Sequence, residues 1–316
     1  MSSDASFSWL QWAVEVFDQR IDFQQGRDTT SDRVRGVLTY NIDPQFRVLA
    51  SAGAERNDFV TLDKKTETTY GGGFEWAPSQ RTDVFANWEH RFFGSRWDYG
   101  LRHRTPGLSL SLVDSRDITT DAQRLGTAGS AVAYDLLFNA LATRIPDPAQ
   151  RAIETQRLLQ QGGIPADLNL PADFLTSGIF VSRNQQASVA LLGARNTAAL
   201  TLYRLMRTQL EGSAGTPTGL ADGRSTVTER GASLALSHRL TPLSSLTALT
   251  TWRRTTGNAS SEQGTRQWDA RLLYTTQFGR KTSGTVEFRH VRADSDFGVA
   301  SDYRENALIV SLLVQF

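Results

Sequence analysis

The chain has 316 residues, a formal net charge of +1 and a pI near 8.1, with 39% hydrophobic and 21% charged residues. This balance provides no global basic field, so it argues against nucleic acid as a partner. Cysteine is absent, which excludes thiol catalysis, disulfides and cysteine metal sites. There is no run of about 18 apolar residues, so the sequence predicts no transmembrane helix.

The first residues, "MSSDASFSW", carry neither a basic region nor an apolar stretch, so we expect that any secretory signal has been removed. From there the chain alternates apolar and polar positions. In "RVRGVLTY", for example, Val34, Leu38 and Tyr40 share one face with Gly36. Runs of this kind predict about 14 strands, long enough to cross a membrane when tilted. They cover residues 6–20, 31–41, 45–55, 66–77, 81–92, 95–104, 107–117, 178–194, 197–208, 226–240, 243–254, 265–277, 281–292 and 303–316.

The links between these strands alternate in character. "NIDPQ", "APSQ", "TPG", "ARNT", "LTPL" and "FGRK" are rich in turn-forming residues, and longer polar loops mostly lie between them. "FFGS", after the fifth strand, is an exception. Short turns at one end and long loops at the other are typical of outer-membrane barrels, in which the short turns face the periplasm.

A soluble β-sandwich would also alternate apolar and polar positions. Its apolar faces would need large side chains to build a dense core, whereas many here are Gly and Ala. The pattern instead favours a barrel that is apolar outside and polar inside, which explains how a chain with a mean hydropathy of -0.35 can end on the apolar strand "ALIVSLLVQF". We expect that last strand to pair with the first, because an open edge in lipid leaves backbone groups unsatisfied.

Aromatic residues on the apolar face gather at two heights, as in the two girdles that anchor membrane barrels. Phe46 belongs to the group near the short-turn end. The predicted girdle residues are Tyr40, Trp76, Trp88, Trp97, Trp252, Trp268, Tyr274 and Phe316.

Residues 118–176 interrupt the strand pattern. "AVAYDLLFNALAT" fits one helix, and "DPAQRAIETQRLLQQGG" fits another, with Asp147 as N-cap, Pro148 at the first helical position and Gly162 past the end. The insert follows an upward strand, so we expect it at the extracellular mouth or folded into the lumen. It would act there as a gate or constriction, or only as a surface cap.

The polar faces carry many charged residues. One interpretation is that opposite charges pair across strands and hold the wall rigid, and the other is that excess arginine binds anionic or hydroxyl-rich solutes. The lumen-lining candidates are Arg33, Arg35, Arg47, Arg91, Arg102, Arg239, Arg253, Arg271, Arg289, Glu75, Asp83, Glu89, Asp98, Asp269 and Glu287.

We find no catalytic or metal-binding motif with supporting context. The four histidines lie on the apolar-face parity, and Ser237 cannot be the partner of His238 because adjacent strand residues point to opposite faces. "GGGF" lies inside a strand and indicates close wall packing rather than a phosphate loop. The sequence therefore predicts no catalytic residue, no cofactor, no metal and no enzymatic activity.

The segments "LTYNIDPQFRVLASAGAERNDF", "YGGGFEWAPSQRTDVFANWEHRFFGSRWDYGLRHRTPGLSLSLVDSRDITT" and "LLGARNTAALTLYRLMR", together with the helical insert, resemble the PEP-CTERM system-associated outer-membrane proteins of Gram-negative bacteria. The resemblance rests on strand texture and on the position of the insert. It implies an envelope protein associated with exopolysaccharide loci, without catalytic residues to transfer. The N-terminal extension expected in that family is absent or truncated in this sequence.

Together these patterns predict an all-β fold, a transmembrane antiparallel up-and-down β-barrel spanning residues 1–316 with a helical insert between strands 7 and 8. The predicted function is an outer-membrane channel or export port for polysaccharide or another polar solute. The alternatives are a plugged transporter for hydrophobic ligands and a structural barrel without conductance. The expected partners are outer-membrane lipid and lipopolysaccharide, the barrel-assembly machinery and polysaccharide export components.

Overall fold

The computed structural model describes residues 9–22, 28–60, 63–120, 132–162, 164, 179–210, 226–257, 264–279, 281–295 and 302–314. Within these ranges the chain forms 14 strands and two helices. The strands are β1 (Leu10–Ile21), β2 (Thr29–Asp43), β3 (Phe46–Asn57), β4 (Lys65–Ser79), β5 (Thr82–Arg91), β6 (Gly94–Thr105), β7 (Leu108–Thr120), β8 (Ile179–Leu192), β9 (Asn196–Gln209), β10 (Thr226–Thr241), β11 (Ser244–Gly257), β12 (Gly264–Gly279), β13 (Thr282–Ser295) and β14 (Tyr303–Val314). The helices are α2 (Val132–Leu141) and α3 (Pro148–Gly162).

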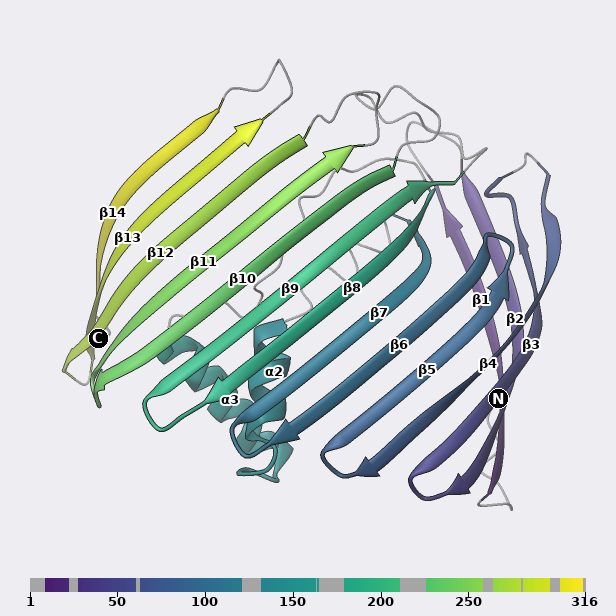
Figure 1. The fold of residues 1–316 in the computed structure, drawn as a ribbon, viewed down its shortest axis with the longest axis horizontal. Coiled ribbons are helices and arrows are strands. Elements are labelled where there is room, and N and C mark those ends of the chain that lie inside the picture. Colours follow the sequence, from purple (N-terminus) through teal and green to yellow (C-terminus); the bar gives the residue numbers. More distant parts are fainter. Residues whose placement is uncertain are drawn as a thin grey trace.

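The strands form one antiparallel sheet in chain order, each pairing with its sequence neighbours. The sheet is curled, with β14 at the left of the view in Figure 1 and β1, β2 and β3 at the right. This is the transmembrane up-and-down β-barrel that the sequence predicts, with the helices between β7 and β8. Neither described helix is long and apolar enough to cross a membrane.

Strand positions follow the predicted ranges closely, with one informative difference at the start of the insert. β7 continues to Thr120 because Ile118 and Thr119 pair with Val181 and Phe180 of β8. The backbone N–H of Ile118 also donates to the carboxylate of Asp117 at 2.7 Å. The insert therefore begins after residue 120, not at residue 118.

The short turns form where Pro, Gly and Asx residues predict them. Between β2 and β3 the Asp43 carboxylate accepts hydrogen bonds from the backbone N–H groups of Gln45 at 2.7 Å and Phe46 at 2.8 Å. A side chain that binds the backbone in this way replaces ladder bonds lost at the turn. The exceptional link at the opposite end contains Gly94, whose φ of 95° is the left-handed conformation that a tight turn there requires.

The two faces of the sheet differ as the alternation predicts. On the outer face the large apolar side chains are exposed, among them Leu308 at 71% and Val310 at 70%. The residues opposite them on β13 are Phe288 and Val286, which are also exposed. Exposed apolar surface on this scale marks contact with lipid. The inner face of the curled sheet, called the lumen below, carries the helices and most of the ion pairs.

β1 and β14 are the two edges of the described sheet, since each pairs with one neighbour there. β1 runs away from the short-turn end and β14 runs toward it, so the two are oriented to pair antiparallel. Closure between them stays a prediction.

The facing assignment makes a prediction about assembly. Val48→Lys on β3 or Val310→Lys on β14 places a charge in the apolar band and should block folding, because such a charge costs about 2 to 4 kcal/mol at the membrane midplane. Ser51→Lys, on the inner face of β3, should fold normally. Heat-modifiable gel migration reports folding, and equal tolerance at the two faces would contradict the assignment.

Candidate functional site

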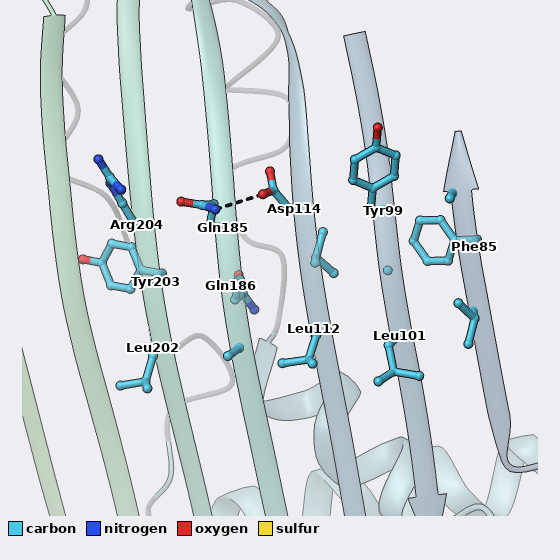
Figure 2. Close-up of a pocket in the computed structure, with 15 residues that line it drawn as sticks. Phe85, Tyr99, Leu101, Leu112, Asp114, Gln185, Gln186, Leu202, Tyr203 and Arg204 are labelled. Atoms are coloured by element: carbon cyan, nitrogen blue, oxygen red, sulfur yellow. Dashed lines mark hydrogen bonds between the residues drawn. The ribbon is translucent and has the colours of Figure 1, made fainter. Parts of the chain in front are cut away.

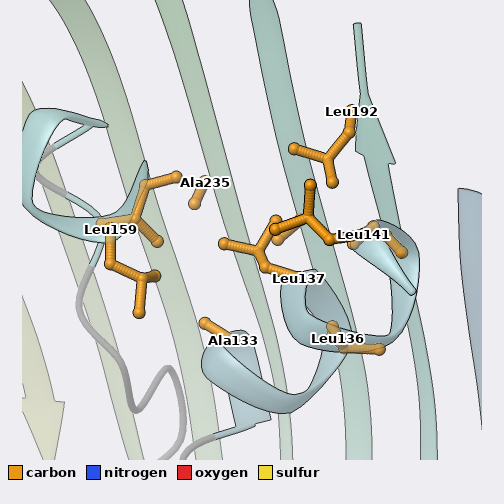
Figure 3. Packing of buried hydrophobic residues seen from close by; sticks show 11 residues of the cluster. Ala133, Leu136, Leu137, Leu141, Leu159, Leu192 and Ala235 are labelled. Carbon is orange, nitrogen blue, oxygen red and sulfur yellow. The ribbon is translucent and has the colours of Figure 1, made fainter. Parts of the chain in front are cut away.

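The helical insert packs on the inner face of the barrel wall. Three alanines of adjacent strands form a row there, because Ala190 of β8 is opposite Ala199 of β9, which is opposite Ala235 of β10. All three are 0% exposed. Leu137 of α2 is fully buried in the cluster that contains them (Figure 3). Small wall residues leave the space that the helix occupies, so α2 docks as a plug.

Around this row the plug has a compact apolar core. α2 contributes residues at helical spacing, and α3 adds Leu159. The plug thus buries one face of each helix and is held mainly by hydrophobic contacts with the wall. The core residues are Ala133, Leu136, Leu137, Ala140, Leu141, Leu159, Ile164, Ala190, Leu192, Ala199 and Ala235.

Local hydrogen bonds shape the connection between the two helices. Asp147 caps α3, accepting at its carboxylate from the backbone N–H groups of Ala149 at 3.1 Å and Gln150 at 3.4 Å, so the predicted N-cap is confirmed. Gly162 is the last residue of α3 and not the residue beyond it. Arg151 places its guanidinium 4.6 Å from the centroid of the Phe138 ring, which links α3 to α2.

The plug lies at the end of the lumen where the short turns are, behind β8 and β9 in Figure 1. Ser245, two residues from a short turn at the start of β11, donates to the carbonyl oxygen of Gln161 at 2.8 Å. Short turns mark the periplasmic side of such barrels. The helices are therefore at the periplasmic end, away from the extracellular mouth.

A network of ion pairs covers the lumen wall toward the opposite end. Arg91 binds the fully buried carboxylate of Glu55 through two nitrogens, at 3.0 and 2.6 Å, and also contacts Asp117 at 2.8 Å. Arg96 binds the second oxygen of Asp117 at 2.7 Å and approaches Glu89 to 3.7 Å. These contacts link β3, β5, β6 and β7.

Glu89 extends the same network to the first strands. It is 3% exposed and accepts from Arg33 at 3.1 and 3.2 Å and from Arg35 at 3.4 Å. Arg35 also lies 3.1 Å from Glu15 of β1. These four arginines and four carboxylates, called the luminal network below, carry no net charge. It comprises Glu15, Arg33, Arg35, Glu55, Glu89, Arg91, Arg96 and Asp117.

Glycine lets this network form. Gly71 lies opposite Glu89 in the sheet, and a Cβ at Gly71 would meet the Glu89 backbone at 2.9 Å. The absence of side chains here allows Arg33 of β2 to reach Glu89 of β5 across two intervening strands. The interpretation of "GGGF" as close wall packing is confirmed.

The remaining lumen candidates form smaller, separate contacts. Arg47 pairs with Glu75, Arg102 with Asp83 at 3.7 Å, Arg271 with Asp269 at 2.8 Å and Arg289 with Glu305. Arg253 donates to the Gln267 side chain and Arg239 to the backbone carbonyl of Ala194 at 2.5 Å. Asp98 lies opposite Asn87 and Ser115, and Glu287 lies opposite Leu273 and Ile309.

A cavity of about 710 Å³ lies between α2 and the wall. Most of its lining residues are polar or charged, and both signs of charge are present, with Arg102, Arg104 and Asp135 among them. Asn139 of α2 and Asn184 of β8 add amide groups. Partial burial raises the pKa of the Asp135 carboxyl above its ordinary value, against the opposing effect of Arg102. The cavity thus offers hydrogen-bonding and charged groups beside apolar surface.

Girdle residues lie on the outer face at two heights. Trp88 is opposite Trp97, and Trp252 is opposite Trp268. Trp97 has a second role, since its indole N–H donates to Asp114 at 3.0 Å. Phe316 lies outside the described residues. The other predicted girdle residues, Tyr40, Trp76, Trp88, Trp252, Trp268 and Tyr274, are exposed.

The histidines join strands on the outer face. His238 contacts the Asn196 amide oxygen at 2.6 Å, whereas the Ser237 hydroxyl accepts from Thr247 at 2.9 Å, so Ser237 and His238 have separate partners as predicted. His103 similarly contacts Thr82 at 2.9 Å.

Comparisons with known proteins find similarity in structure at very low sequence identity. No protein-family model and no curated protein matches the chain. Two solved structures similar to it are OmpT (in-vitro folded), an outer membrane protein of Vibrio cholerae, and a loop L8 deletion mutant of that protein. Identity is 8% in both cases. The first comparison covers 96% of this chain and 93% of the other with a TM-score of 0.36, and the second covers 97% and 98% with a TM-score of 0.37.

The chain is an outer-membrane β-barrel, located in the bacterial outer membrane. One prediction is corrected here. Absence of sequence motifs led us to expect no enzymatic activity, but absence of a linear motif does not exclude catalytic residues that assemble in space. The expectation that the chain is not an enzyme is therefore withdrawn.

Four residues of the luminal network are absent from the predicted lumen candidates. They lie on the polar-face parity of predicted strands, where the alternation rule places lumen residues, and they are Glu15, Glu55, Arg96 and Asp117. What the rule could not supply is the partner of each charge. The Arg33 to Glu89 pair joins residues 56 positions apart, across two strands.

Plug docking can be tested by substitutions on either side of its contact with the wall. Leu137→Ala removes a fully buried side chain and should weaken docking by about 2 to 5 kcal/mol. Ala199→Phe should also displace α2, because no space remains for the larger ring. In both variants amide hydrogen exchange should accelerate in residues 132–162 while the strands stay protected. Unchanged exchange in these helices would contradict the packing, and Ile153→Ala, at an exposed position of α3, is the matched control.

Proposed function

We propose that this protein is an outer-membrane channel or export port for polysaccharide or another polar solute, with α2 and α3 as its gate. The observation that carries the proposal is the polar cavity between α2 and the wall, at the periplasmic end of a lumen lined with charged and amide groups. Channels use such groups to replace the hydration of a passing solute.

Charge pairing favours a solute without strong net charge. The arginines of the luminal network are matched by carboxylates within 3.7 Å, so their fields largely cancel at a distance. Hydroxyl groups can exchange hydrogen bonds with Asn, Gln and paired Arg groups as a glycan moves. This supports polysaccharide over small anions as the transported class.

The gate is supported by how the plug is attached. α2 rests on the alanine row chiefly through apolar side chains, and burial of one leucine contributes about 1.5 to 3 kcal/mol. A few such contacts are strong enough to hold the plug in the lumen and weak enough for the plug to be displaced from the wall. The resemblance to exopolysaccharide-associated outer-membrane proteins agrees with this function, and it suggests polysaccharide export components and the barrel-assembly machinery as partners.

The proposal predicts the electrical behaviour of a shortened chain. Replacing residues 131–165 with a short Gly/Ser linker should leave the barrel folded, since long insertions at loops contribute little to the closed wall. Single-channel conductance in planar bilayers should rise several-fold, because the narrowest section of a water-filled pore dominates its resistance.

Leu137→Asp provides a control of full chain length, since it should release the plug and raise conductance in the same direction. A shortened barrel that folds yet conducts no better than the full chain would show that the insert is not the gate. If neither the full chain nor the shortened chain carries current, the result would favour the structural barrel without conductance.

A further inference from the structure

Four arginines form a straight row across the outer face of the barrel. Arg204 of β9 is opposite Arg230 of β10, Arg230 is opposite Arg254 of β11, and Arg254 is opposite Arg266 of β12. They share the outward parity of Leu202 and the girdle tryptophans. Arg204, Arg230 and Arg266 are exposed and Arg254 is half-buried. This set is called the arginine row below.

Within the described residues no member of the arginine row makes an ion pair. The row ends at Asp294 of β13, which lies opposite Arg266 but is bound by Arg292 at 3.0 Å. The outward Arg183 likewise has its own partner, Asp114, at 2.7 Å. Like charges directly opposite on neighbouring strands are destabilising. Four in succession, about 5 Å apart, form a row at which a bound anion would relieve the repulsion.

The height of the row indicates which anions it meets. Trp252 and Trp268 are an opposing pair two residues nearer the membrane centre than Arg254 and Arg266. Interfacial tryptophans lie at the level of lipid head groups, so the row is at head-group level or about 7 Å beyond it. It is on the side opposite the short turns, which places it in the outer leaflet.

A groove beside Arg204 suits a lipid chain. It has a volume of about 630 Å³ and crosses the outer face from β5 to β9. Figure 2 shows its polar end at Arg204, Gln185 and Asp114, with Leu202 and Leu112 farther down the strands. The Asp114 carboxylate is already bound by Arg183 and accepts from Gln185 at 2.9 Å, which reduces its repulsion of an incoming anion.

We propose that the arginine row and the adjacent groove form a binding site for a phosphorylated glycolipid of the outer leaflet, that is, lipopolysaccharide. Guanidinium groups bind phosphate oxygens through two parallel hydrogen bonds, so two neighbouring arginines suit one phosphate. The row spans about 14 Å, which provides for more than one phosphate on a single head group. An acyl chain of the same lipid lies in the groove below Arg204. The site is independent of whether the lumen conducts.

The test is native mass spectrometry of the refolded full chain in dodecyl maltoside, titrated with purified lipopolysaccharide. The probe lipids for comparison are the same lipopolysaccharide after removal of its phosphates and phosphatidylethanolamine. We expect occupancy by intact lipopolysaccharide at concentrations at least tenfold lower than for either comparison lipid. Inorganic phosphate at millimolar concentration should neither bind detectably nor compete. Equal binding of the dephosphorylated lipid, or full competition by inorganic phosphate, would overturn the proposal.

Variants locate the site. Arg204→Gln, Arg230→Gln, Arg254→Gln and Arg266→Gln combined should weaken lipopolysaccharide binding at least tenfold. Arg20→Gln, at an outward arginine of β1 already paired with Asp22, should change it less than twofold. The combined variant should fold, as gel migration can verify, because it relieves repulsion between like charges. Undiminished binding by the combined variant would place the lipid elsewhere and contradict the assignment. If that variant does not fold, the single change Arg230→Gln, at an inner position of the row, must still reduce binding.

Discussion

Backbone hydrogen bonding in lipid is the constraint on which the rest of this structure depends. No water is present in the hydrocarbon core to satisfy an unpaired N–H or C=O group, and each such group costs several kcal/mol. The strands must therefore pair along their whole length in register. Once they do, side chains alternate strictly between two faces, and every chemical property of the wall follows from which face a residue occupies.

Small residues then determine where the helices and the ion pairs fit against the inner face of the wall. On the inner face the alanine row of β8, β9 and β10 makes room for α2, while Gly71 makes room for the luminal network. Large side chains at these positions would fill the lumen, so a low share of bulky residues is a structural requirement and not a weakness of the core. The network in turn links six of the first seven strands, all except β4. Removal of one buried charge such as Glu55 would leave Arg91 without its main partner.

Local features of this fold were predictable from the sequence, and long-range ones were not. Alternation identified the strands, turn residues identified the short links, and Asp147 followed by Pro148 identified the start of α3, because each depends on a few consecutive residues. The location of the plug depends on three alanines that meet only through strand register. Parity alone marks Arg204, Arg230, Arg254 and Arg266 as charges on an apolar face. Their alignment in one row needed the pairing of four strands. The prediction of no enzymatic activity was withdrawn for another reason. Absence of a linear motif does not exclude catalytic residues that assemble in space.

Closure of the seam is the condition for everything else, because a lumen, a gate and a continuous lipid face all require that β1 pair with β14. The chain has no cysteine, so engineered pairs report on this directly. Ala13→Cys on β1 should be combined in turn with Ala307→Cys, Ile309→Cys and Ser311→Cys on β14, all on the inner face, in protein refolded into lipid vesicles. Paired strands hold opposing Cα atoms within disulfide range, so at least one combination should cross-link as completely as the neighbouring-strand control Thr285→Cys with Ser311→Cys. No cross-link in any combination, with the control fully oxidised, would show that the sheet is open and contradict the account.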